Sequence, residues 1–221
     1  TGKPAENILR ERNFVPVSNE GNTPPYRLAI LLSGSGRTLE NLLRHQKAGV
    51  LAASIDLVVS NRESVRGVTI AEEAGIPTVV STKGDASLET WSSIVFDHCR
   101  TANVELVVMA GFLQLITIPS DFEHRVINIH PSLLPAFGGK GFYGNRVHTA
   151  VIEQGCTTSG CTVHFVDNEY DHGPILLQSQ VPVTTDDTSE SLAARVFSEE
   201  CETLPKAINM LSKKHKQKFK H

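Results

Sequence analysis

Cysteine is scarce in this chain, the net charge is not positive, and long hydrophobic runs are absent. The 221 residues include four cysteines and no CxxC pair, which excludes a zinc ribbon and a thioredoxin-like redox motif. The net charge of −3 provides no basic surface for a nucleic acid, so we expect no such partner. The longest strongly apolar run covers residues 106–113. A membrane-spanning helix needs about 20 apolar residues, so we also expect no membrane partner.

The few cysteines are expected to be small, buried or half-buried thiols in a reducing compartment. They are Cys99, Cys156, Cys161 and Cys201. A disulfide between Cys156 and Cys161 across a turn is the alternative. This composition is typical of a soluble intracellular protein.

Both ends of the chain have the composition of poorly ordered segments. Residues 1–26 are polar and show no sustained periodicity, which predicts a leader. The chain begins with Thr1 instead of Met, so the leader is a candidate remnant of an organelle import peptide. We therefore expect a location in the cytoplasm or in the lumen of a plastid or mitochondrion. Residues 213–221 are rich in Lys and His and are expected to be a solvated basic tail.

Short apolar runs alternate with helical patterns between residues 27 and 212. Buried strands are predicted at 28–32, 55–59, 106–109 and 125–130, and helices at 38–48, 64–74 and 88–102. Strands that alternate with helices of this length form βαβ units. The sequence therefore predicts a single α/β domain with a mostly parallel, Rossmann-like sheet.

The second half of the chain has a different pattern. Residues 133–144 are rich in Gly and form a predicted loop, and a helix is expected near 146–154. Residues 158–166 and 175–183 alternate like strands that pair antiparallel. Asp187 and Glu190 resemble a capping box that opens a last amphipathic helix.

A glycine-containing loop, Ser33-Gly34-Ser35-Gly36-Arg37-Thr38, lies between the first strand and the first helix. Backbone N–H groups at a helix start bind anions, and glycines let the backbone approach a ligand closely. The loop lacks the last glycine of G-x-G-x-x-G, and the second strand ends in Asn61-Arg62, with no acid placed to hold a ribose 2′-hydroxyl. The expected ligand of the loop is therefore a single phosphate on a small molecule rather than a dinucleotide. The alternative is a tight turn that binds no ligand.

Asn128 and His130 occupy the end of a predicted strand, and alternation places them on the same face. Ligands of open α/β sheets bind beyond the carboxyl ends of the parallel strands. An amide donor beside an imidazole could stabilise an oxyanion there. Asp171, in the loop 167–174, could favour the charged imidazolium from nearby. A satisfied structural histidine and an ordinary Asx turn are the alternatives.

Other chemistries have weaker support. His164 and His172 could join His130 in a metal site, but no H-x-x-x-H or H-E-x-x-H spacing occurs, and we expect no metal. No G-x-S-x-G elbow supports a Ser/His/Asp hydrolase.

Four segments, 31–38, 107–112, 127–135 and 160–182, resemble the phosphoribosylglycinamide formyltransferase family of folate-dependent enzymes. The N-I-H-P-S-L-L-P string followed by D-x-G-P is specific for the formyltransferase superfamily. The Ser-Gly-x-Gly loop narrows the resemblance to the member of this superfamily that acts on the ribonucleotide. The resemblance extends over roughly residues 27–212, which would form the catalytic domain.

The resemblance implies a role for each part of the constellation. Asn128, His130 and Asp171 correspond to the catalytic trio. Gly36, Arg37 and Thr38 correspond to the phosphate site, and Glu200 to the residue that meets the ribose or glycinamide part. The folate site would consist of Leu113, Gln114, Leu115, Ile116, Asn128, Asp167, Asn168, Glu169, Tyr170 and Asp171.

The implied reaction transfers a formyl group from the co-substrate 10-formyltetrahydrofolate to the amine of glycinamide ribonucleotide, a step of purine biosynthesis. Its partners are therefore small molecules. Relatives often have Met-Arg-Ile-Leu at residues 113–116, and the loop 138–145 is longer than in some of them.

Three alternative functions remain at this stage. Formyltetrahydrofolate hydrolysis would normally need an N-terminal regulatory domain, and initiator-tRNA formylation a C-terminal domain. A catalytically silent nucleotide-binding module would keep the glycine loop without folate-dependent turnover.

Overall fold

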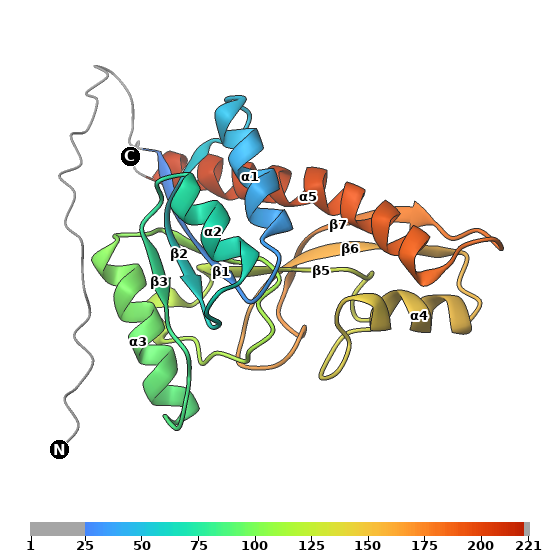
Figure 1. Ribbon diagram of the computed structural model, residues 1–221. Helices are drawn as coiled ribbons and strands as arrows, with labels where there is room; N and C mark the ends of the chain where they lie inside the picture. The colour runs from blue at the N-terminus through green and yellow to red at the C-terminus, as the bar shows by residue number, and fades with distance from the viewer. Residues whose placement is uncertain (1–24, 219–221) are drawn as a thin grey trace.

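A seven-stranded sheet forms the centre of the computed structural model, which describes residues 25–218 (Figure 1). The strand order is β3-β2-β1-β4-β5-β6-β7. The strands are β1 (Tyr26–Leu32), β2 (Ala53–Ser60), β3 (Thr78–Val80), β4 (Leu106–Met109), β5 (Val126–His130), β6 (Thr158–Phe165) and β7 (Ile175–Pro182). Strands β1 to β5 are parallel, whereas β6 and β7 are antiparallel to their neighbours. This confirms the predicted α/β fold with a mostly parallel sheet.

Helices cover both faces of the sheet. They are α1 (Arg37–Lys47), α2 (Arg66–Glu73), α3 (Leu88–Thr101), α4 (Asn145–Glu153) and α5 (Ser189–Lys218), with a short 3-10 helix, η1 (Ser120–Phe122). The core face with α1, α2, α4 and α5 receives Leu28, Ile30 and Leu32 of β1. The opposite face, covered by α3 and η1, receives Ala29 and Leu31. Strand β1 is therefore buried on both sides, which explains its continuous apolar run.

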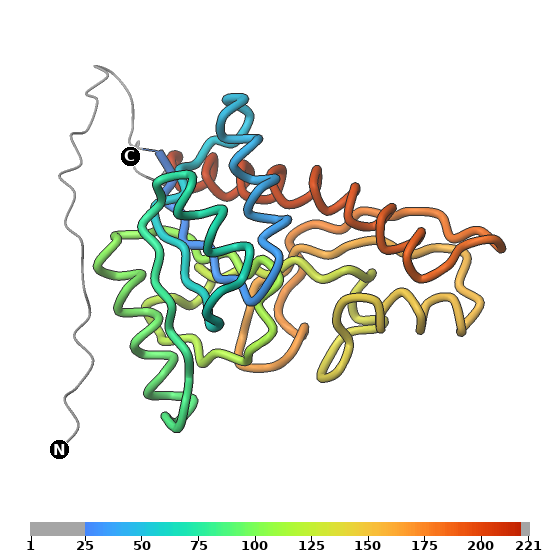
Figure 2. The backbone as a smooth tube through the Cα atoms, viewed as in Figure 1, coloured from blue at the N-terminus to red at the C-terminus, as the bar shows by residue number. Residues whose placement is uncertain are grey.

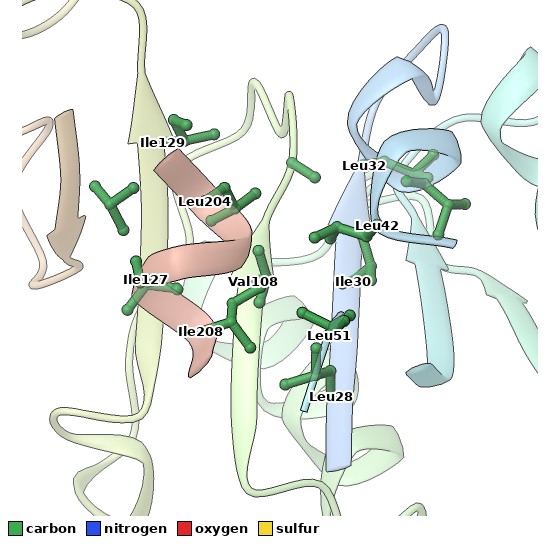
Figure 3. Close-up of a cluster of buried hydrophobic side chains, with 14 of the residues drawn as sticks. Leu28, Ile30, Leu32, Leu42, Leu51, Val108, Ile127, Ile129, Leu204 and Ile208 are labelled. Atoms are coloured by element: carbon green, nitrogen blue, oxygen red, sulfur yellow. The ribbon is translucent and has the colours of Figure 1, made fainter. Parts of the chain in front are cut away.

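The long helix α5 connects the two ends of the sheet on one face. It packs against β7 and β6 at one end and against α1 and β2 further along (Figure 2). Leu204 and Ile208 of α5 lie over the central strands, beside Val108 and Ile127 (Figure 3). All four side chains are fully buried, so α5 closes the core over the parallel strands.

The order of the strands reverses between β1 and β4, since β2 lies on one side of β1 and β4 on the other. At such a reversal, the connections from the two strands leave in opposite directions and open a crevice beyond their carboxyl ends. The glycine loop follows β1 at this point, and Ala110 and Gly111 follow β4. The crevice is therefore the place where a ligand site is expected.

The predicted boundaries differ from the structure at both ends of the domain. Tyr26, which was assigned to the leader, is buried and begins β1. Residues 213–218, which were assigned to the tail, continue α5. The rest of the predicted leader, residues 1–24, and of the tail, 219–221, lies outside the described residues.

The start of α5 lies one residue later than the predicted capping box. Thr188 and Ser191 form the reciprocal pair, because Thr188 Oγ1 accepts from Ser191 N at 3.2 Å and Ser191 Oγ accepts from Thr188 N at 3.0 Å. Asp187 instead binds Arg195 through both carboxylate oxygens. The ion pair with Arg195 therefore takes the carboxylate that was predicted to cap the helix.

All four cysteines are free thiols, so the alternative Cys156–Cys161 disulfide is wrong for this structure. Burial raises the pKa of the Cys99 and Cys161 thiols to about 12. Within residues 25–218, none of the helices combines the length and apolarity needed to cross a membrane.

Helices α1 and α2 approach each other closely at two glycines. Gly36 has a left-handed φ of 71°. A Cβ on it would lie 2.5 Å from the Cα of Gly67, at the start of α2. Glycine at position 36 is therefore required both by the backbone conformation and by the neighbouring helix.

Gly36→Ala is expected to lower the free energy of unfolding by about 1–3 kcal/mol, because the new Cβ meets backbone in a strained conformation. Gly34→Ala is the matched control, since no heavy atom lies within 4 Å of a Cβ there. Urea denaturation of both variants measures the difference. Equal stability of the two variants would contradict the close approach of α1 and α2.

Candidate active site

A cavity of about 330 Å³ opens beyond the carboxyl ends of β1, β4 and β5. Its wall includes every residue predicted for catalysis or for the ribonucleotide, namely Gly36, Arg37, Thr38, Asn128, His130, Asp171 and Glu200. These residues come from four distant parts of the chain. The fold therefore brings the predicted constellation together in one place.

The glycine loop forms one end of this cavity. Gly36 caps α1 without any side-chain hydrogen bond to the first turn, so the N–H groups there are not capped by a side chain. Ser33 Oγ accepts from the Leu113 N–H at 2.9 Å, which ties the loop to the segment after β4. This end of the cavity has the backbone geometry of an anion site.

His130, at the end of β5, lies between two acceptors. Its Nε2 donates to the Phe137 carbonyl at 2.8 Å, and its Nδ1 lies 3.4 Å from Asp171 Oδ1. A carbonyl oxygen only accepts, so Nε2 carries a proton in this arrangement, and the Asp171 carboxylate lies beside the other ring nitrogen. The side chain is 5% exposed, so the pairing is shielded from water.

Asp171 is held by donors from separate segments. Its Oδ2 accepts from the Gly139 N–H at 3.0 Å, and its Oδ1 accepts from Asn128 Nδ2 at 3.5 Å. The residue has a left-handed φ of 53°. Backbone strain of this kind is common where a side chain must be aimed at a functional site.

The glycine of the D-x-G-P string has a steric reason. A Cβ on Gly173 would lie 1.9 Å from the Phe165 carbonyl oxygen, so only glycine lets the loop return against β6. Phe165 N in turn donates to the Pro174 carbonyl at 2.9 Å. These contacts fix the loop two and three residues after Asp171.

His164 forms a hydrogen bond with the Asn128 amide. The sequence interpretation did not predict this contact. His164 Nδ1 donates to the Phe165 carbonyl at 2.9 Å, so Nε2 is left as an acceptor for Asn128 Nδ2 at 3.2 Å. Burial lowers the pKa of His164, which keeps it neutral and suited to accept. The sequence suggested His164 only as a possible metal ligand, because nothing in its strand pattern shows which neighbour it meets.

His148 of α4 is another histidine in the cavity wall that sequence reasoning did not select. Its Nδ1 is buried without a hydrogen-bond partner. Burial, together with the charge of His130, lowers its pKa. His148 therefore favours its neutral form.

Glu200 reaches the cavity from the middle of α5. Burial raises its pKa to about 7, and the nearby charge of Arg37 opposes this increase. A carboxyl group that changes its protonation near neutral pH inside a cavity is typical of a functional position.

A smaller cavity of about 60 Å³ shares Phe112, Asn128, Tyr170 and Asp171 with the larger one. Of the predicted folate-binding residues, Gln114, Leu115, Ile116, Asn128, Glu169, Tyr170 and Asp171 line it. Leu113 lines only the larger cavity.

Asp167 and Asn168 do not line either cavity but fix the surrounding loop. Asn168 Oδ1 accepts from the Ile118 N–H at 2.8 Å. Asp167 Oδ2 pairs with His172 Nδ1 at 2.8 Å. In the part of the chain that the structure describes, no three His, Cys, Asp or Glu side chains are grouped to hold a metal ion.

Comparisons with known proteins identify the family of the chain. The family model described as formyl transferase matches residues 26–208. The chain is 41% identical over 188 residues to a protein of Vigna unguiculata named chloroplastic phosphoribosylglycinamide formyltransferase, covering 84% of this chain and 60% of that one. A protein of the same name from Arabidopsis thaliana is 42% identical over 178 residues, covering 79% and 61%. The chain thus spans about 60% of the length of these curated relatives.

A solved structure gives the same result at the level of the fold. The crystal structure of glycinamide ribonucleotide transformylase 1 from Symbiobacterium toebii is 32% identical and superposes with a TM-score of 0.80. The match covers 88% of this chain and 93% of that one. On the sequence match, the shared fold and the cavity, this chain belongs to the formyl transferase family.

Proposed function

We propose that this protein transfers a formyl group from 10-formyltetrahydrofolate to the amine of glycinamide ribonucleotide, a step of purine biosynthesis. The observation that carries the proposal is one cavity with an anion-binding loop at one end and Asn128, His130 and Asp171 in its wall. The names of the relatives from Vigna unguiculata and Arabidopsis thaliana support it. Their chloroplastic designation supports an organelle as the compartment.

The two cavities divide the substrates between them. In our proposal, Gly36, Arg37 and Thr38 bind the phosphate, and Glu200 meets the ribose or glycinamide part. The folate pterin occupies the smaller cavity, between residues 114–116 and residues 169–170. Asn128 and Asp171 line both cavities, so the formyl group and the attacking amine meet beside them.

The chemistry follows from the donors at this junction. The amine attacks the formyl carbon and forms a tetrahedral oxyanion, which the His130 imidazolium and the Asn128 amide stabilise. The oxyanion replaces the Phe137 carbonyl as the acceptor of His130 Nε2–H, and it replaces Asp171 Oδ1, 3.5 Å away, as the acceptor of one Asn128 Nδ2–H. The amine then loses a proton and N10 of the folate gains one as the C–N bond breaks. Asp171 holds His130 charged and carries this proton, directly or through a water molecule.

The test is an assay of formyl transfer with both substrates and the purified protein. We expect turnover that needs both ligands, and Asn128→Ala should lower kcat by about 10²–10³-fold because one oxyanion donor is lost. Circular dichroism checks that the variant is folded. Release of formate without glycinamide ribonucleotide would indicate hydrolysis instead, and phosphate-ligand binding without turnover would indicate a silent binding module.

Asp171→Asn keeps the shape of the side chain and removes its charge. The imidazolium of His130 then loses its counter-charge, so the alkaline limb of the pH–rate profile should move to lower pH. Because the two residues act as a unit, Asp171→Asn combined with His130→Ala should be little slower than His130→Ala alone. Steady-state kinetics between pH 5 and 9 measure both effects. An unchanged profile in Asp171→Asn would refute the pairing.

Glu200 allows a test that depends on stability and pH. Its pKa is raised to about 7 in the folded protein, so its contribution to stability is present below the usual pKa of 4.5 and is lost as pH rises through 7. Glu200→Gln should therefore be more stable than the wild type by about 1–3 kcal/mol at pH 8, with no gain at pH 4.5.

Urea denaturation at the two pH values measures this change. Glu202→Gln is the control, because that carboxylate is 58% exposed on the same helix. A gain of the same size at both pH values would mean that burial of the Glu200 charge is not its cause.

A further inference from the structure

Arg37 and Phe197 form a stacked pair in the wall of the larger cavity. The Arg37 guanidinium carbon lies 3.7 Å from the centroid of the Phe197 ring. Arg37 is the first residue of α1, directly after the glycine loop, and Phe197 lies on α5. Both side chains line the cavity. The pair therefore connects the predicted anion site to the long helix that closes the core.

The relative position of the two helices is fixed one turn further along. Asn41 Nδ2, four residues after Arg37, donates to the Cys201 carbonyl at 2.8 Å, four residues after Phe197. Asn41 is buried, so this hydrogen bond is protected from water. The ring of Phe197 is consequently held at a fixed place above the start of α1.

The hydrogen-bonding groups of Arg37 are not engaged by protein partners. Within residues 25–218, Arg37 has no ion pair within 4 Å and no side-chain hydrogen bond. Neighbouring Arg66 differs, because its guanidinium binds the Glu40 carboxylate through one nitrogen. Stacking covers only a flat face of the guanidinium, so its N–H groups point outward in the plane. Such an edge matches two oxygens of a phosphate.

Glu200, one turn of α5 after Phe197, is an acid of the cavity wall whose charge interacts with that of Arg37. Burial raises its pKa to about 7, so near neutral pH it is ionised only in part. The positive charge of Arg37 is therefore not fully neutralised by the protein. It stays available for an anion at the glycine loop.

We propose that Phe197 is a positioning residue that holds the Arg37 guanidinium beside the glycine loop, where it clamps the phosphate monoester of the acceptor substrate. This inference rests on the proposed function for the identity of the substrate but not for the chemistry of the phosphate site. Arg37 is exposed, and a long exposed side chain loses rotamer freedom when it binds a ligand. Stacking on the ring orders it beforehand, which favours phosphate binding.

The effect is confined to the phosphate end of the substrate. Loss of the ring should raise KM for glycinamide ribonucleotide and leave kcat at saturation and folate binding unchanged. A residue that merely supported the fold would change all three quantities. Phosphate-free glycinamide ribonucleoside should bind equally well to the wild type and to a variant that lacks the Phe197 ring.

The experiment measures binding of glycinamide ribonucleotide and of its phosphate-free ribonucleoside by calorimetry. The proteins are the wild type, Phe197→Leu, Arg37→Met and the double variant. We expect each single variant to weaken ribonucleotide binding about 10-fold, from losing an oriented charge-assisted contact. The double variant should be no weaker than Arg37→Met, since Phe197 acts through Arg37. Phe197→Tyr keeps the ring face and should restore wild-type binding.

Arg100→Met is the matched control, because Arg100 also lies over an aromatic ring, that of Phe122, but does not line either cavity. It should bind both ligands like the wild type. Equal losses of ribonucleotide and ribonucleoside in Phe197→Leu would overturn the proposal, as would fully additive losses in the double variant.

Ribose 5-phosphate, compared with ribose, separates this inference from the proposed function. If the wild type fails to formylate glycinamide ribonucleotide, the proposed function fails, but binding of ribose 5-phosphate should still depend on both Arg37 and Phe197. If the wild type formylates the ribonucleotide and Phe197→Leu binds and turns over like the wild type, the positioning role alone is wrong.

Discussion

The buried carboxylate of Asp171 joins three segments that are far apart in the sequence. It accepts from Asn128 of β5 and from Gly139 of the loop after that strand, faces His130, and lies 3.7 Å from His164 of β6. Its side chain is only 12% exposed, so an unpaired charge there would be costly. The loop, β5 and β6 therefore stabilise the carboxylate together, and the positions of the other polar groups depend on it.

Much of this architecture follows from local patterns in the sequence. The apolar run at 106–109 coincides with β4, because a strand buried on both faces needs apolar residues throughout. The two-residue period places Asn128 and His130 on one face of β5, and the parallel order of the strands puts that strand end at the crevice. The glycine loop could be predicted because the start of α1 needs a residue that tolerates a left-handed φ. Glycine, at position 36, is that residue.

Contacts between distant segments could not be predicted in this way. Arg37 and Phe197 are separated by 160 residues, and no periodicity indicates that α5 passes beside the start of α1. In the sequence, His164 is an ordinary position of an alternating strand. Its hydrogen bond with Asn128 forms only because β6 pairs with β5. The shift of the α5 cap has a similar cause, because Arg195 pairs with Asp187 by a contact that the capping pattern does not include.

Three buried histidines, His130, His148 and His164, lie at the centre of the site and differ in their partners. His164 and His148 are both buried, and burial lowers the pKa of each, with the charge of His130 acting in the same direction. His130 differs because its Nε2 donates to the Phe137 carbonyl and its Nδ1 lies 3.4 Å from Asp171 Oδ1. In the proposed reaction, His130 is therefore the one of the three that supplies an N–H donor, next to the amide of Asn128. The two neutral rings keep competing positive charge away, so the stabilising field is concentrated where an oxyanion would form.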